Sequence, residues 1–151
     1  MGEIVINYVR ASLGDVKAKE PAYATKGSAG MDLSACIDRD ILVKPGEIVK
    51  VPTGIAIQIP DIGIAGFVFP RSGLSSKHGV SLANCVGVID SDYTGEIICP
   101  VINHGKNDYI VKNGDRIAQI VFMPVFTAAF REVSELAETE RGSGGFGSTG
   151  K

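Results

Sequence analysis

The feature that most restricts the fold of this 151-residue chain is a series of short apolar runs, each followed by residues that favour turns. Three runs, 64–69, 96–102 and 117–126, have the length of a strand and are rich in β-branched or aromatic residues. In residues 55–59 isoleucine alternates with alanine and glutamine, which is the two-residue period of a half-buried strand. Turn-forming residues separate the runs at 44–46, 60–63, 104–108 and 112–115. Many short strands at near-regular spacing predict an all-β sandwich, jelly roll or barrel.

Helix signals are sparse. Residues 72–78 are expected to form one or two helical turns, and residues 134–139 to form another, with Ser134 as its N-cap. The length fits one domain, and the chain shows neither an internal repeat nor a second domain.

Composition excludes several classes of protein. Hydrophobic residues make up 44% of the chain and charged residues 21%, with a formal net charge of -2, which is typical of a globular protein and not of a disordered one. A weakly negative chain lacks the basic surface that general nucleic-acid binding requires. No signal peptide opens the chain, and no run approaches the roughly 18 apolar residues of a membrane span. We therefore expect a cytoplasmic protein that binds neither nucleic acid nor a membrane.

The cysteines and histidines give no metal signature. Cys36, Cys85 and Cys99 show no Cys-x-x-Cys spacing, so we expect three small, buried, reduced side chains. His78 and His104 are isolated, and we expect surface or hydrogen-bonded roles for both.

The C-terminal segment is unusually rich in glycine, with five of the 19 glycines in the last ten residues. Such a segment has too much backbone entropy to order itself, so it is either a disordered terminus or a lid that orders over a ligand. Its other residues favour the lid. Arg141 offers a guanidinium group suited to phosphate, Ser148 and Thr149 offer hydroxyls, and Phe146 offers a ring that can stack on a nucleobase.

Four further segments hold more polar and glycine residues than folding requires: 29–35, 70–77, 84–97 and 114–122. Asp32 lies in the first, where it could be functional or a structural or capping residue. Ser72 lies in the second, at the start of the predicted helix, and helix starts can bind anions. Asp90 lies at a strand end in the third, where it could act as a base or belong to an aspartate-rich turn. Gln119 lies in the fourth, inside an apolar strand, where its amide needs a partner.

Together with the tail, these segments closely resemble, in order, the five motifs of the homotrimeric dUTPase family, from about residue 27 to residue 150. The resemblance implies an all-β, jelly-roll-like (β-clip) domain over residues 1–132. It also implies a flexible C-terminal arm over residues 133–151, and a homotrimer in which each active site takes motifs from more than one subunit. In the family, the arm of one subunit closes over a site that the other subunits build.

The resemblance also implies the roles of residues near the reacting phosphate. Asp90 matches the general base that deprotonates a water molecule, which then attacks the α-phosphorus. Mg²⁺ is the implied cofactor, held mainly by the phosphates and by water, and Asp32 would contact it through water. Arg71, Ser72, Gly73 and Gln119 match phosphate-contacting positions.

Other matched positions imply how uracil and the sugar are recognised. Asn84 and the backbone of Gly87, Val88 and Ile89, with Ile98 on the return strand, match the uracil-reading hairpin. Tyr93 matches the residue that packs against deoxyribose and excludes a 2′-hydroxyl. In the arm, Phe146 would stack on uracil, while Arg141, Ser148 and Thr149 would meet the terminal phosphates. Gly147 would be a further substrate-binding position.

The implied function is the hydrolysis of dUTP to dUMP and diphosphate, which keeps uracil out of DNA and supplies dUMP for thymidylate synthesis. One alternative is a dCTP deaminase, a family that shares the fold. Its catalytic glutamate would fall at about Pro100, which cannot do acid–base chemistry. The other alternative is a catalytically silent nucleotide-binding or regulatory module, which loss of the base or of the tail would indicate. Both are present here.

Overall fold

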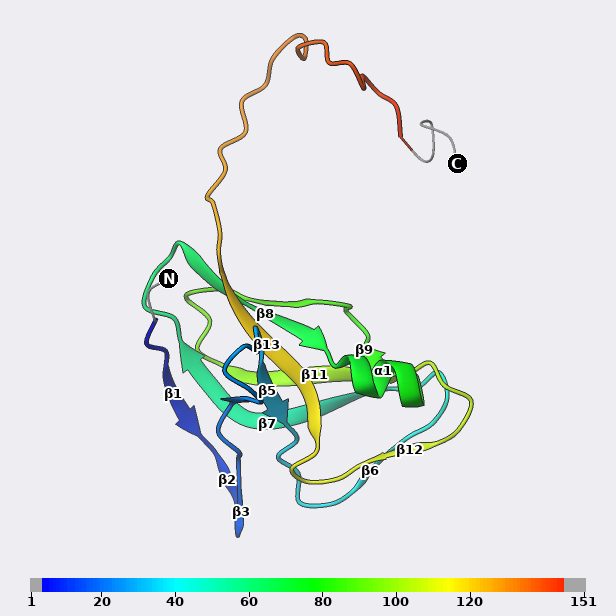
Figure 1. The fold of residues 1–151 in the computed structure, drawn as a ribbon. Helices are drawn as coiled ribbons and strands as arrows, with labels where there is room; N and C mark the ends of the chain where they lie inside the picture. The colour runs from blue at the N-terminus through cyan, green and yellow to red at the C-terminus, as the bar shows by residue number, and fades with distance from the viewer. Residues whose placement is uncertain (1–3, 146–151) are drawn as a thin grey trace.

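The computed structural model describes residues 4–145, which form thirteen strands and one short helix (Figure 1). The strands are β1 (Asn7–Arg10), β2 (Ser12–Leu13), β3 (Val16–Lys17), β4 (Ala22–Tyr23), β5 (Met31–Ser34), β6 (Ile41–Val43), β7 (Ile48–Gln58), β8 (Ile64–Pro70), β9 (Val80–Leu82), β10 (Gly87–Ile89), β11 (Glu96–Asn103), β12 (Tyr109–Val111) and β13 (Arg116–Pro124). The helix is α1 (Ser72–His78). The predicted all-β class is confirmed.

Two sheets form the body of the domain. One has the order β1-β7-β11-β9, the other has the order β10-β8-β13-β5-β4, and the strand pairs in both are antiparallel. The core contains buried side chains from both sheets, including Val51 and Val101 of the first and Leu33 and Ile120 of the second. Alternate residues of each strand point to opposite faces, so one face of each sheet is buried.

The runs singled out in the sequence coincide with the central strands. Residues 64–69 lie in β8 and residues 96–102 in β11, while residues 117–126 form β13 as far as Pro124. Ile55, Ile57 and Ile59 are buried, as their alternation predicts. The predicted helix at 72–78 is confirmed as α1.

The second predicted helix, at residues 134–139, is wrong, because that segment has no regular structure. The chain leaves the domain after β13 as an extended segment (Figure 1), and Phe130 and Leu136 within it are almost fully exposed. A helix this short is marginal in water, and here no packed surface stabilises it.

The three cysteines differ in burial. Cys36 and Cys99 are buried in the core, as predicted, but Cys85 is exposed, so the prediction of three buried cysteines is wrong. Cys85 occupies a turn ahead of β10 with a φ of 59°, a left-handed conformation that places it outside the alternation of a strand.

No helix in the described range 4–145 is long and apolar enough to cross a membrane.

Candidate active site

A hollow of about 300 Å³ lies between β10 and β11. Its lining comes from β8, β9, β10, β11 and the turns beside them: Val68, Leu82, Asn84, Gly87, Val88, Ile89, Asp90, Tyr93, Glu96, Ile97, Ile98, Cys99 and Pro100. The structure thus brings together the predicted base and the uracil- and sugar-reading residues predicted in segment 84–98. We call this space the first hollow.

The backbone of β10 is suited to reading a flat polar ligand. Within its sheet β10 pairs only with β8, so its other edge keeps unpaired N–H and C=O groups. The absence of a side chain at Gly87 lets Asn84 and Val68 lie close to the β10 backbone. A Cβ at this position would lie 3.3 Å from the Asn84 amide nitrogen and 3.4 Å from Val68. The free edge of β10 can therefore offer hydrogen bonds to the edge of a nucleobase.

Asp90 follows the last residue of β10, and its side chain is exposed while lining the first hollow. Its carbonyl oxygen accepts a hydrogen bond from the Tyr93 N–H at 3.1 Å, which closes the turn after the strand. The turn fixes the backbone and leaves the carboxylate facing the hollow, where it can accept a proton from a water molecule.

Tyr93 also lines the first hollow, and the residue is 44% exposed. Its hydroxyl donates a hydrogen bond to the carbonyl oxygen of Glu96 at 3.0 Å. The carboxylate of Glu96 in turn accepts a hydrogen bond from the Gly54 N–H of β7 at 2.7 Å. The first bond is local to the hairpin, and the second holds the end of the hairpin against β7.

A second hollow of about 430 Å³ lies over β5, the end of β8, the start of α1 and β13. Its lining residues are Ala24, Ser28, Ala29, Gly30, Asp32, Phe69, Arg71, Ser72, Gly73, Gln119 and Val121. The four predicted phosphate-contacting residues and Asp32 therefore meet here. At the start of α1 the N–H groups of Leu74 and Ser75 donate to the Arg71 carbonyl oxygen. Those of Ser72 and Gly73 have no such acceptor among the described residues, which favours an anion beside them.

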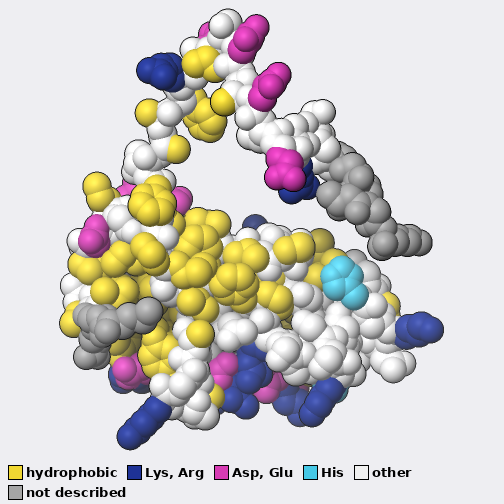
Figure 2. All heavy atoms as spheres, turned by 45° about the horizontal axis from the view of Figure 1, so that its top comes forward, with side chains coloured by type: hydrophobic (Ala, Val, Ile, Leu, Met, Phe, Trp, Pro, Cys, Tyr) yellow, Lys and Arg dark blue, Asp and Glu magenta, His cyan; other side chains and the backbone are white. Residues whose placement is uncertain are grey.

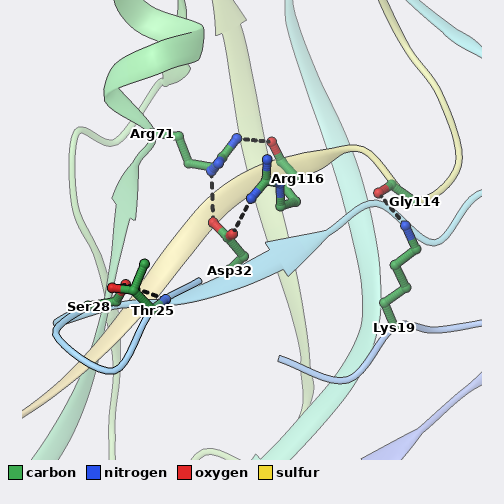
Figure 3. Close-up of polar contacts among 7 residues, drawn as sticks. All are labelled: Lys19, Thr25, Ser28, Asp32, Arg71, Gly114 and Arg116. Atoms are coloured by element: carbon green, nitrogen blue, oxygen red, sulfur yellow. Dashed lines mark hydrogen bonds and ion pairs between the residues drawn. The ribbon is translucent and has the colours of Figure 1, made fainter. Parts of the chain in front are cut away.

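Asp32 forms ion pairs with two arginines at this second hollow (Figure 3). One carboxylate oxygen lies 2.8 Å from Arg71 Nε and the other lies 3.0 Å from Arg116 Nη1. Arg71 also donates to the carbonyl oxygen of Arg116 at 3.3 Å. One carboxylate and two guanidinium groups leave a net positive charge, which suits a phosphate chain.

Gln119 has the partner that its place in an apolar strand requires. Its side-chain nitrogen donates to the carbonyl oxygen of Pro70 at 3.1 Å, and its side-chain oxygen lies against Gly30, where a Cβ would come within 2.7 Å. Gly30 thus leaves room for the Gln119 amide at the surface of the hollow.

The residues of the second hollow suit a metal ion that is already bound to a phosphate-containing ligand. The described part of the chain contains no group of three or more His, Cys, Asp or Glu residues that could hold a metal. Asp32 supplies a carboxylate there, but both of its oxygens are already ion-paired. Mg²⁺ keeps several waters and commonly binds through one or two carboxylates plus substrate phosphates. These residues therefore suit an ion that phosphate oxygens ligate directly and that Asp32 meets through water.

The two hollows are separate on one chain. Val68 lines the first and its neighbour Phe69 lines the second, and successive residues of a strand point to opposite faces of a sheet. Asp90 and Arg71 consequently belong to different hollows, and no described residue lines both.

The described part of the arm, residues 133–145, lines neither hollow in this chain. Arg141 is exposed, and its Nε donates to the carbonyl oxygen of Gly144 at 2.9 Å. Phe146, Gly147, Ser148 and Thr149 lie outside the described residues.

Sequence reasoning assigned no role to Arg116, Glu96 or Gly30. All three lie in the singled-out segments, but their contacts depend on strand pairing between distant parts of the chain. Arg116 reaches Asp32 because β13 pairs with β5, and Glu96 reaches Gly54 because β11 pairs with β7. Position within a motif was the only signal available.

Comparisons with known proteins agree on one family. The model of the dUTPase family matches residues 16–150. A deoxyuridine 5′-triphosphate nucleotidohydrolase of Desulfitobacterium hafniense is 56% identical over 148 residues, which are 98% of this chain and 96% of that protein. A protein of the same name from Acinetobacter baylyi is 52% identical over 131 residues, or 87% of each chain. The solved structure of the Staphylococcus bacteriophage 80alpha dUTPase with dUPNHPP has a TM-score of 0.86 and 26% identity, covering 97% of this chain and 99% of that one.

Proposed function

The chain belongs to the dUTPase family, and we propose that it hydrolyses dUTP to dUMP and diphosphate by means of a water molecule that Asp90 activates. It is thus a hydrolase of nucleotide metabolism. The observation that carries the mechanism is the place of Asp90, whose exposed carboxylate lines the same hollow as the free edge of β10.

The proposed reaction is an in-line displacement at the α-phosphorus. Asp90 accepts a proton from the attacking water, whose oxygen forms a bond to the α-phosphorus. The bond from that phosphorus to the oxygen bridging to the β-phosphorus breaks, and diphosphate leaves with the electron pair. Mg²⁺ bound to the triphosphate would hold it in one geometry and neutralise the charge on the leaving oxygens. On the protein side, Asp32 would contact that ion through water.

Specificity for uracil is proposed to come from the hairpin of the first hollow. The free edge of β10 would pair with the polar edge of uracil, with Asn84 and Ile98 completing the site. A tight hairpin leaves no room for the 5-methyl group of thymine, and the amino group of cytosine would mispair with it. Buried polar groups left without partners are an effective way to reject analogues.

The phosphate chain is proposed to lie in the second hollow, with Arg71, Ser72, Gly73 and Gln119 as contacts. The first and second hollows of one chain face different ways, so a nucleotide can use both kinds of site only where two copies meet. We therefore propose a homotrimer whose active sites combine the first hollow of one copy with the second hollow of another.

The C-terminal arm, residues 133–151, is proposed to close over a site formed by other copies. In the isolated chain Phe126 and Phe130 are fully exposed, which is costly unless another surface covers them. Figure 2 shows a broad gathering of hydrophobic side chains on the domain below the arm. If neighbouring copies covered these two phenylalanines and this hydrophobic surface, Arg141 and the glycine-rich end would come close to a neighbouring site.

The experiment that tests this function measures diphosphate release from dUTP, dTTP, dCTP and UTP with Mg²⁺, for the wild type and Asp90→Asn. We expect rapid release from dUTP alone, and loss of at least about 100-fold in Asp90→Asn, the lower end for a general base. Binding of dUTP without turnover by the wild type would instead indicate a silent nucleotide-binding module. Ammonia released from dCTP would indicate a deaminase.

A further inference from the structure

The ring of Tyr93 lies directly against the backbone of Gly95. A Cβ placed on Gly95 would lie 2.6 Å from the Tyr93 hydroxyl oxygen, 2.7 Å from Cζ and 3.0 Å from Cε2. Carbon atoms that are not bonded to one another normally remain about 3.5–4.0 Å apart. Any side chain at position 95 would therefore displace the ring.

The backbone does not itself require glycine at this position. Gly54, Gly79 and Gly114 have left-handed φ values of 67°, 70° and 81°, where other residues are strained. Gly95 is not in that region of φ, so alanine could adopt its backbone conformation. The space taken by the Tyr93 ring is the feature of position 95 that excludes a side chain.

Hydrogen bonds also hold Tyr93 at its backbone and at its hydroxyl. The Tyr93 N–H is bonded to the carbonyl oxygen of Asp90, and the hydroxyl is bonded to the carbonyl oxygen of Glu96. Glu96 is anchored in turn to the Gly54 N–H. These contacts fix both ends of the Tyr93 side chain, and Gly95 provides the flat surface between them.

We propose that Gly95 is a positioning residue for sugar selection. The absence of a side chain at position 95 lets the Tyr93 ring lie against the Gly95 backbone, where it forms part of the wall of the first hollow. This inference rests on the proposed function, since it places the sugar of the nucleotide beside Tyr93 in that hollow. A ring face offers no strong hydrogen bond to a 2′-hydroxyl, so a ring held in this place favours deoxyribose over ribose.

The test is a double-mutant cycle of Gly95→Ala and Tyr93→Ala, with kcat and KM measured for dUTP and UTP. We expect Gly95→Ala to lower the preference for dUTP over UTP, measured by kcat/KM, by about tenfold or more, mainly through KM for dUTP. In the Tyr93→Ala background the same change should alter the preference by less than about twofold, because the ring it displaces is gone.

Gly27→Ala is the matched control. Gly27 is an exposed glycine whose φ is not left-handed and whose Cβ would meet nothing within 4 Å, so this change should leave both substrates unaffected. Thermal unfolding of each variant shows whether it is folded.

An unchanged preference in folded Gly95→Ala would overturn the inference. An equal loss with and without Tyr93 would overturn it too, since Gly95 would then act through the hairpin backbone alone. If wild-type protein does not cleave dUTP, the proposed function fails instead, so the two failures are distinguishable.

Discussion

At the scale of single residues, Asp32 is notable because its one carboxylate forms ion pairs with two guanidinium groups. Its side chain is 18% exposed, and those of Arg71 and Arg116 are 25% and 54% exposed. Without the carboxylate, two cations would face each other across β5, β8 and β13. Asp32 therefore orients Arg71 toward the second hollow, and its proposed contact with Mg²⁺ through water would add to that role.

Replacement of Asp32 by alanine is expected to weaken both folding and substrate binding. The free energy of unfolding should fall by about 1–2 kcal/mol, toward the low end for charged hydrogen bonds because the pairs are partly exposed. KM for dUTP should rise, since Arg71 is no longer held in place. Chemical denaturation and steady-state kinetics measure the two effects, with Asp38→Ala as an exposed acidic control. Unchanged stability and unchanged KM would show that the ion pairs with Asp32 neither stabilise the fold nor hold Arg71 in place.

Cys99 provides a prediction about pH. Burial raises the pKa of the Cys99 thiol from 9.0 to about 12, so the folded protein keeps a proton that the unfolded chain loses in this range. Stability contributed by this group is complete below pH 9 and is lost as the pH rises toward 12. The slope should approach about 1.4 kcal/mol per pH unit for this one proton.

Cys99→Val removes the titrating thiol. When the free energy of unfolding is measured from pH 8 to pH 11, its decline with pH should therefore be less steep in this variant, by up to about 1.4 kcal/mol per pH unit. Cys85→Ala is the control, because Cys85 is exposed and its replacement should leave the slope unchanged. Parallel declines in the wild type and Cys99→Val would contradict the assignment.

At the scale of elements, the contact between β7 and the start of β11 links the fold to the site. Gly54 interrupts β7 with its left-handed φ, and a Cβ there would lie 2.6 Å from Ala18 and 3.0 Å from Cys36 Sγ. The freed Gly54 N–H finds its acceptor in the Glu96 carboxylate, beside the register shift in the β7–β11 pairing. Glu96 thereby fixes the end of the hairpin that carries Asp90 and Tyr93.

Glu96→Ala should leave the buried Gly54 N–H without its acceptor and lower the free energy of unfolding by about 1–3 kcal/mol. Glu96→Gln keeps a side-chain oxygen of the same reach and should retain most of the stability. Denaturant unfolding of the two variants measures the difference. Equal losses would mean that the charge of Glu96, and not this hydrogen bond, is what stabilises the hairpin.

The elements that the sequence predicted are those with strong local patterns. β8, β11, β13 and α1 could be read because apolar runs and turn residues lie next to one another in the chain. The two-residue strands β2, β3 and β4 could not, because they are exposed and exist only through pairing. The helix at 134–139 failed for a related reason, since local propensity without a packed face does not stabilise so short a segment.

The candidate site was predictable to a similar degree. Motif positions identified many of the residues that line the two hollows, including Asp90 and Gln119, but not Val68, Leu82 or Phe69. They did not reveal that Asp32 pairs with two arginines or that Gly95 lies under Tyr93. Those facts follow from strand register and ring orientation, which a linear pattern does not specify.

At the scale of the whole molecule, the central fact is that the proposed base and the proposed phosphate site lie in different hollows of one chain. The free edge of β10 and Asp90 form one half of a site, while Arg71, Ser72 and Gln119 form the other half. The exposed arm extends away from the domain (Figure 1), and its described residues, 133–145, line neither hollow. This separation is the basis of our proposal that a complete active site combines more than one copy.

The most direct test of this account is complementation between Asp90→Asn and Arg71→Ala. Each variant alone should release almost no diphosphate from dUTP. Differently tagged copies, co-expressed and purified as mixed assemblies, should recover activity, because an intact Asp90 of one copy meets an intact Arg71 of another. In a ring of three, each mixed assembly has one intact site of three, so it should show about one third of the wild-type activity. Mixed assemblies that stay as inactive as their parents, or an Asp90→Asn protein that is active alone, would contradict the account.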